Sequence, residues 1–259
     1  MVLAVNIGNS HILLGCFQEE KIWFLDRIST KRDATALDYI VLIKTVLELN
    51  RFAPSQFRGG IISSVVPSVT PTVKEAMTRL LNKPVMVVGP GIKNGLKIML
   101  DNPAQLGSDR VVNAVAAVNH YPCPGIVIDL GTATALSVID QGKCLIGGMI
   151  LPGVKLSLDA LTSQASQLPQ ISLTPPKKLI ASNTADCLKS GMIYGTAAAI
   201  DGIVCKIEEE LGRPCTLIAT GEFAGDVIPF CSRTDIIIDD RLLLKGLMII
   251  YDKNQIQYN

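Results

Sequence analysis

A short motif occurs twice in this chain, and its two copies lie about half a chain apart. The first copy reads VNIGNS at residues 5–10, and the second reads IDLGTA at residues 128–133. In each copy an apolar run typical of a buried strand is followed by a glycine and small residues. Asn6 and Asp129 are 123 residues apart in a chain of 259. A repeat at half the chain length predicts two related halves.

The order of the elements around the two copies supports a duplication, because strands and helices follow one another similarly in both halves. We expect a duplicated α/β fold in which each half has a mixed sheet flanked by helices. The boundary lies near residues 116–124, which gives an N-terminal half at 1–118 and a C-terminal half at 119–259. The expected strands are 2–5, 12–17, 21–28, 60–66, 84–88, 125–129, 135–139, 143–150, 215–219 and 236–238, and the expected helices are 33–50, 72–81, 105–119, 153–165, 184–211, 222–230 and 240–251.

Charge and cysteine usage narrow the class of partners. The 24 Lys and Arg residues against 23 Asp and Glu residues leave a net charge of +1, so no basic field favours nucleic acid or an anionic membrane. The apolar start is broken at Asn6 and Gly8, which is unlike a signal sequence or a membrane span. Seven scattered cysteines without a C-x-x-C pair indicate reduced thiols and a cytoplasmic protein. The expected partners are small molecules and a second copy of the chain.

The repeated motif suits phosphate binding. Glycine lets the backbone approach a ligand closely, and the neighbouring hydroxyl and N–H groups can surround phosphate oxygens. An acid at the end of the strand, as at Asp129, can hold a cation. Two such copies facing one another across a cleft are expected of an ATP-binding fold related to actin, hexokinase and the Hsp70 ATPase.

Further motifs lie in order between residues 5 and about 222. They are NIGNS at 6–10, GSDR at 107–110 after Asn102-Pro103, DLGTAT at 129–134, GGMILPG at 147–153, and Thr184 followed by SGMIYG at 190–195. Together they resemble the motifs of the type III pantothenate kinase family. The resemblance implies ATP-dependent phosphorylation of pantothenate to 4′-phosphopantothenate, the first step of coenzyme A biosynthesis.

The resemblance implies a role for each matching residue on the pantothenate side. Asp109 would be the general base that takes the proton of the pantothenate hydroxyl, as suits a reaction that depends on positioning and charge neutralisation. Arg110 would bind the pantothenate carboxylate or steady the site. Thr184 would contact the substrate across a homodimer interface. Gly107, Ser108 and Leu100 complete the expected substrate-binding residues.

The resemblance also implies the nucleotide and cation sites. Mg²⁺ would be held mainly through the phosphates of ATP, and Asp129 would hold a potassium or ammonium ion. The residues expected to bind ATP are Asn6, Gly8, Asn9, Ser10, Gly131, Thr132, Thr134 and Gly221.

Four positions depart from the family's motifs. Asn6 replaces an aspartate and loses a negative charge near Mg-ATP. Ala135 replaces a threonine, Leu100 stands in a region where a tyrosine is common, and Glu222 replaces a glycine. These departures leave two alternatives open. One is a weak or inactive family member that binds nucleotide or another ligand or acts in regulation, and the other is a kinase for a different small hydroxyl compound.

Purely structural roles are also open at single positions. Asp109 is compatible with a negative charge favoured at a helix N-terminus, and Thr184 with the N-cap of its helix. Thr132 and Thr134 are compatible with ordinary strand residues.

Overall fold

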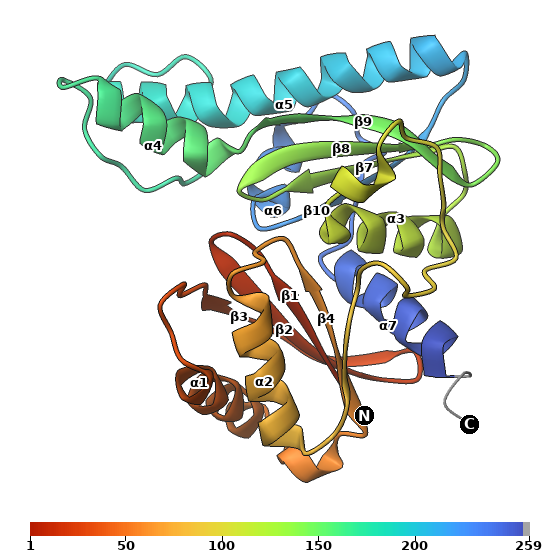
Figure 1. Cartoon of the computed structure of the whole chain (residues 1–259). Helices are drawn as coiled ribbons and strands as arrows, with labels where there is room; N and C mark the ends of the chain where they lie inside the picture. Colours follow the sequence, from red (N-terminus) through yellow and green to blue (C-terminus); the bar gives the residue numbers. More distant parts are fainter. Residues whose placement is uncertain (256–259) are drawn as a thin grey trace. The chain divides into compact units, whose positions relative to one another are not determined.

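The computed structural model describes residues 1–255, and these form two compact units (Figure 1). Unit 1 contains Met1–Leu96, Asp101–Asn119 and the described residues from Arg241 onward. Unit 2 contains Lys97–Leu100 and His120–Asp240. The passage from one unit to the other after Asn119 lies one residue from the expected boundary. The terminal helix differs from the expected division, because it groups with unit 1 and not with the C-terminal half.

Unit 1 contains a five-stranded mixed sheet in the order β3-β2-β1-β4-β5. β1 pairs antiparallel with β2 and parallel with β4. The strands are β1 Val2–Ile7, β2 His11–Gln18, β3 Lys21–Ser29, β4 Gly59–Ser64 and β5 Val85–Val87. The helices are α1 Ala36–Leu49, α2 Thr70–Leu81, α3 Ser108–His120 and α7 Leu242–Gln255, with 3-10 turns at Pro54–Gln56 and Pro103–Gln105.

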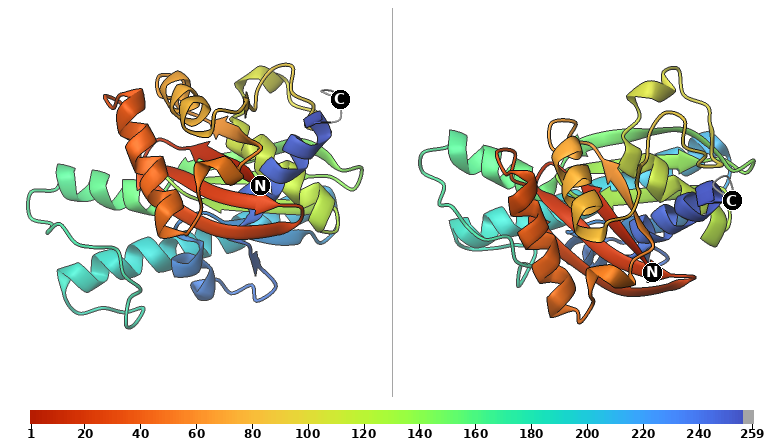
Figure 2. Two further views of the ribbon diagram at one scale, coloured as in Figure 1. Left: turned by 90° about the horizontal axis from the view of Figure 1, so that it is seen from below. Right: turned by 60° about the horizontal axis from the view of Figure 1, so that its bottom comes forward.

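Helices cover both faces of the unit 1 sheet. α1 and α2 pack against one another (Figure 2) and form a buried core with alternate residues of β1, among them Leu3 and Val5. α7 contacts β1, β2 and β4, and Leu244 of α7 fills the space where a side chain at Gly15 would lie. Glycine in β2 therefore lets α7 approach the strand closely. α1 begins at a capping box, in which Thr35 and Asp38 bond to each other's backbone N–H.

Unit 2 contains a six-stranded mixed sheet in the order β11-β10-β7-β8-β9-β6. Its longest helix, α5, spans the 28 residues Thr184–Leu211, the same range as the sequence predicts. Residues 165–183 before it contain no helix or strand. The strands are β6 Lys97–Ile98, β7 Gly125–Leu130, β8 Ala133–Ile139, β9 Cys144–Pro152, β10 Thr216–Thr220 and β11 Ile237–Ile238, and the other helices are α4 Val154–Gln164, α6 Ala224–Val227 and a 3-10 turn at Ile228–Phe230.

The predicted α/β fold is confirmed, and the two sheets show the repeat. Strands β9-β8-β7-β10-β11 follow the same order, with the same parallel and antiparallel pairings, as β3-β2-β1-β4-β5. The first hairpin turn is one residue longer, because Ile7 pairs with Ile12 whereas Leu130 pairs with Thr134. β8 begins at Ala133, two residues before the expected start at 135, and the edge strand β6 lies in a segment where no strand was predicted.

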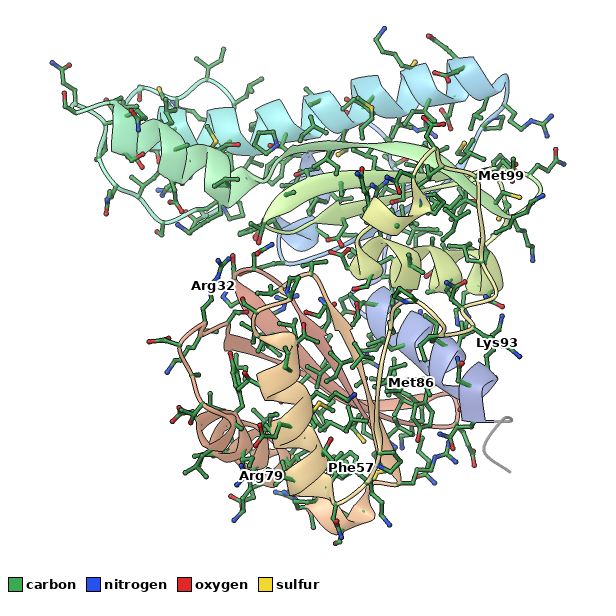
Figure 3. All side chains as sticks on the ribbon, viewed as in Figure 1. Arg32, Phe57, Arg79, Met86, Lys93 and Met99 are labelled. Atoms are coloured by element: carbon green, nitrogen blue, oxygen red, sulfur yellow. The ribbon has the colours of Figure 1, made fainter. Side chains whose placement is uncertain are left out.

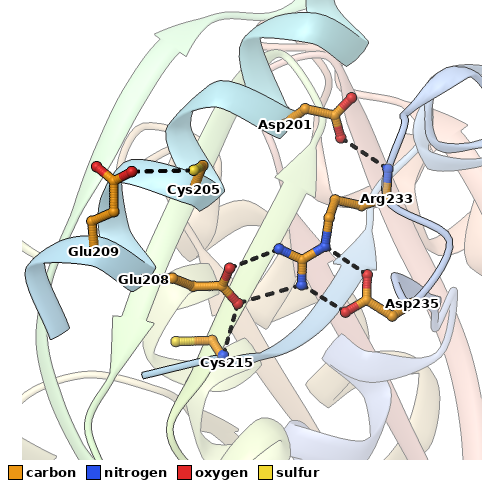
Figure 4. A network of polar contacts seen from close by, with 7 residues as sticks. All are labelled: Asp201, Cys205, Glu208, Glu209, Cys215, Arg233 and Asp235. Carbon is orange, nitrogen blue, oxygen red and sulfur yellow. Dashed lines mark hydrogen bonds and ion pairs between the residues drawn. The ribbon is translucent and has the colours of Figure 1, made fainter. Parts of the chain in front are cut away.

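A charged network fastens the segment before β11 to α5 (Figure 4). The Arg233 guanidinium bonds to Glu208 at 2.7 Å and to Asp235 at 2.6 Å. Asp201 of α5 accepts the Ser232 N–H at 2.6 Å, and Glu208 also accepts the Cys215 N–H at 2.9 Å. The hydrogen bond from Arg233 is the main reason that the pKa of Glu208 lies below its usual value. The network ties α5 to the residue that precedes β10 and to the segment that precedes β11.

Candidate active site

The first copy of the motif forms a rigid turn between β1 and β2. The Gly8 N–H donates to the His11 carbonyl at 3.0 Å, and a Cβ atom on Gly8 would lie 3.0 Å from the same oxygen. The segment after β3 holds the turn from the side: Thr30 Oγ1 donates to the Gly8 carbonyl at 2.7 Å, and Thr30 N–H to the Ser10 carbonyl at 3.0 Å. These hydrogen bonds hold the backbone of the turn that carries the small residues expected to meet phosphates.

Arg32 adds a positive charge to this turn, which the motif comparison missed. Its Nη2 atom donates to Asn9 Oδ1 at 3.3 Å on the surface of unit 1 (Figure 3). The planar guanidinium has several donors and suits phosphate oxygens. The only local signal was the basic pair Lys31-Arg32 directly after the third expected strand. Their relation to residues 8–10 follows from the pairing of β2 with β3.

Asn6 is beside the turn, at the penultimate position of β1. It is a register partner of Ser63 in the parallel neighbour β4. Its Oδ1 atom is buried and has no hydrogen-bond partner. Leaving such an acceptor unpaired costs about 1–3 kcal/mol, so this oxygen is suited to a ligand, a cation or its water.

This donor set fits a Mg²⁺ ion that arrives with ATP. In the described part of the chain, no three His, Cys, Asp or Glu side chains gather into a cage for a metal. Mg²⁺ usually keeps several waters and is bound through one or two protein oxygens and the substrate phosphates. The unpaired Oδ1 of Asn6 is one such oxygen, although it carries no charge.

The start of α3 is fastened to the end of β4 by Ser108. Its Oγ atom lies 2.9 Å from Ser63 Oγ, accepts the Ser64 N–H at 2.9 Å and contacts the Ser64 carbonyl at 2.8 Å. Ser108 was expected to bind substrate, whereas here its hydroxyl is engaged within the protein. Since Ser63 neighbours Asn6, these contacts bring Asn6 and the GSDR motif into one cluster.

Asp109 follows Ser108 in the first turn of α3. The Arg110 N–H donates to Asp109 Oδ1 at 2.7 Å, and a Cβ atom on Gly107 would lie 2.6 Å from that oxygen. Burial raises the pKa of the Asp109 carboxyl, although the Arg110 N–H and the Arg110 charge lower it. A helix dipole alone would lower the pKa. The raised pKa makes this carboxylate a better proton acceptor than an exposed aspartate.

Glycines shape the second copy of the motif in unit 2. The Gly131 N–H donates to the Ala133 carbonyl at 3.0 Å, and the Gly153 N–H donates to the Thr132 carbonyl at 3.2 Å. A side chain at Gly153 would overlap the turn's carbonyl oxygens, so the end of the GGMILPG motif requires glycine there. Gly221 has φ +99°, and its Cβ would lie 2.7 Å from Asp129 Oδ1. Residues far apart in the sequence thus meet at one turn.

Three expected site residues lie apart from these clusters. Thr134 is the register partner of Leu130, whereas Asp129 pairs with Ala135, so the Thr134 and Asp129 side chains point to opposite faces of the sheet. Leu100 follows the edge strand β6 in unit 2. Thr184 is the exposed first residue of α5.

The structural alternative for Thr184 is wrong, because the helix cap is its neighbour. Asn183 Oδ1 accepts the Asp186 N–H at 2.9 Å and satisfies the first turn of α5. The Thr184 hydroxyl is therefore not needed to begin the helix.

Sequence comparison relates the chain to one family along nearly its whole length. The profile described as type III pantothenate kinase matches residues 2–206. A type III pantothenate kinase of Brevibacillus brevis is 39% identical over 257 residues, which cover 98% of this chain and 100% of that protein. A protein of the same name from Exiguobacterium sibiricum is 40% identical over 255 residues, with the same coverage of both chains.

Solved structures of low sequence identity share the fold. The activator of the 2-hydroxyisocaproyl-CoA dehydratase from Clostridium difficile, solved with bound ADPNP, matches with a TM-score of 0.56 at 10% identity. The matched residues make up 99% of this chain and 96% of the activator. A ROK family protein from Streptococcus pneumoniae, solved with sucrose, matches with a TM-score of 0.52 at 12% identity, covering 99% of both chains. These likenesses show that the chain shares the two-sheet α/β fold of these proteins.

Proposed function

The chain belongs to the type III pantothenate kinase family, whose reaction is the ATP-dependent phosphorylation of pantothenate, and we propose that Asp109 is its general base. The observation that carries this proposal is the fixed, half-buried carboxylate with a raised pKa at the start of α3. The family match does not favour the alternative of a binding protein without kinase activity.

In the proposed reaction, the hydroxyl oxygen of pantothenate attacks the γ-phosphorus of ATP. The hydroxyl proton passes to the Asp109 carboxylate, the new P–O bond forms, and the bond to the β-phosphate oxygen breaks to release ADP. Mg²⁺, when bound with ATP, neutralises phosphate charge. Arg110 binds the pantothenate carboxylate, and Ser108 positions Asp109 by holding α3 on β4.

The nucleotide is assigned to the two turns and their neighbours. Gly8, Asn9 and Ser10 lie along the phosphates, where Arg32 adds positive charge. Support for Gly221 comes from its φ of +99° and from the 2.7 Å that would separate its Cβ from Asp129 Oδ1, whereas Gly131 and Thr132 are assigned from the likeness of their motif to the family's. Asp129 holds a potassium or ammonium ion. Thr134 is left out of this assignment because it faces away from Asp129.

A homodimer and a cytoplasmic location complete the proposal. Unit 2 exposes large apolar side chains, with Ile150 67% exposed, Leu179 59% and Ile180 83%, which suits a subunit interface. Thr184 and Leu100 would contact pantothenate in such a dimer. All seven cysteines are free, as suits a reducing compartment. None of the described helices is long and apolar enough to cross a membrane.

The test is direct detection of 4′-phosphopantothenate by mass spectrometry after incubation with ATP, Mg²⁺, pantothenate and a potassium or ammonium salt. The native chain is expected to form product, and Asp109→Asn to lose it. Asp159→Asn is the matched control, because Asp159 is an exposed aspartate on α4 whose carboxylate pairs with Lys155. Retained turnover in Asp109→Asn would refute the general-base role.

The Asn6→Asp variant separates loss of the function itself from a defect caused by the missing charge at Asn6. Product from this variant alone would mean that the loss of charge at Asn6 disables an otherwise complete site. Absence of product from both the native chain and Asn6→Asp would refute pantothenate phosphorylation by this chain.

A further inference from the structure

Unit 2 contains a cavity that the proposed reaction does not use. It has a volume of about 280 Å³ and is lined by residues of the hairpin β8–β9 and of the helices α4 and α5. Figure 1 labels these four elements. α4 contacts both α5 and β8, so residues of three elements line the cavity, which opens to solvent at the exposed lining residues Pro152, Gly191 and Gly195. Its volume is near the lower limit of about 300 Å³ for small-molecule pockets, which suits a fragment-sized ligand and not a nucleotide.

Small residues on α5 make the space. Gly191, Gly195 and Ala199 line the cavity and recur at intervals of four, so they share one face of the helix. A Cβ atom on Gly191 or on Gly195 would meet nothing within 4 Å. The cavity is therefore open along this helix face, where larger side chains would otherwise fill it.

A second, independent observation comes from Thr134. This residue is only 3% exposed, and its Oγ1 atom has no hydrogen-bond partner. Thr134 and Leu136 both line the cavity, and they point to the same face of β8 because they are two residues apart. Buried hydroxyls are nearly always paired. By contrast, Thr196 in the same lining already donates to the Met192 carbonyl at 2.6 Å.

We propose that this cavity binds a small uncharged molecule, mostly apolar, with a carbonyl or amide group that pairs with the Thr134 hydroxyl. The lining contains no Lys, Arg, His, Asp or Glu side chain, so a charged group would lose its hydration without a counter-ion. This chemistry excludes the triphosphate of ATP and the carboxylate of pantothenate as occupants.

The probe pair is isovaleramide and isovalerate, which have similar size but differ in charge. Binding to the full chain is measured from the methyl NMR signals of Met192 and Ile203, which line the cavity. Isovaleramide is expected to shift these signals saturably at millimolar concentration, and isovalerate at neutral pH is not. Equal binding of both probes, or no shift with isovaleramide, would overturn the proposal.

Two variants test the location of the site. Gly195→Leu is expected to fill the cavity and abolish the shifts, whereas Gly202→Leu is the matched control, because Gly202 lies on α5 outside the lining and also has open space at its Cβ. Thr134→Val keeps the shape but removes the hydroxyl, so isovaleramide should bind about tenfold more weakly. The same variant should unfold at an equal or higher temperature, because the unpaired hydroxyl is gone. Unchanged affinity in Thr134→Val, or equal loss in both glycine variants, would refute the site.

Discussion

Replacing Ser108 with alanine tests whether the start of α3 is held by β4. The hydroxyl of Ser108 contacts three groups within 2.9 Å, namely Ser63 Oγ, Ser64 N–H and the Ser64 carbonyl. A net hydrogen bond contributes about 0.5–1.5 kcal/mol, and a buried group left unpaired costs about 1–3 kcal/mol. With Ser63 fully buried, we expect Ser108→Ala to lower the free energy of unfolding by about 2–4 kcal/mol.

The assay is urea unfolding followed by circular dichroism, together with turnover measured under native conditions. The control is Ser163→Ala on α4, where an exposed hydroxyl donates to the Ala160 carbonyl at 2.9 Å. This substitution should lower the free energy of unfolding by less than about 0.5 kcal/mol. Because Asp109 is next to Ser108, turnover per folded molecule should also fall while the KM for ATP changes little. A loss of stability no larger than that of the control would refute the anchoring role of Ser108.

Three further predictions concern the turns and the proposed base. Gly221→Ala should destabilise by about 1–3 kcal/mol, because alanine is strained at φ +99°, whereas Gly225→Ala has open space and should not; equal unfolding midpoints would contradict this. Asp109→Asn should lose turnover yet unfold at a higher temperature than the native chain at pH 7. The pKa of Asp109 is raised by folding, so its ionised form opposes folding above the unfolded-state pKa of about 3.9. Below that pH the difference in unfolding temperature should vanish. Arg32→Gln should raise the KM for ATP about tenfold, while Arg79→Gln, which removes only a surface pair with Glu75, should leave it unchanged.

Local patterns in the sequence predicted most of the helices and strands. Glycine turns and apolar runs located nearly every strand, and the long, mostly apolar stretch at 184–211 was predicted as a helix at its observed bounds, although its N-cap is Asn183 and not Thr184. The six-residue repeat indicated the duplication, because similar runs of strand and turn residues around each copy form similar strand pairings. The family followed from motifs whose order along the chain is itself sequence information.

The tertiary structure decided which of those residues meet. α7 belongs to unit 1, where Gly15 lets it approach β2 and its own Gly246 lets it approach α3. Both contacts join residues that lie more than 100 positions apart in the sequence. Ser63 and Ser108 pair across 45 residues, which no local pattern encodes. Strand pairing directs Thr134 away from Asp129, although both belong to one motif. The sequence alone determined the strands, helices and family, because these depend on near neighbours; the alignment of Asn6, Ser108 and Asp109 required strand register and long-range hydrogen bonds.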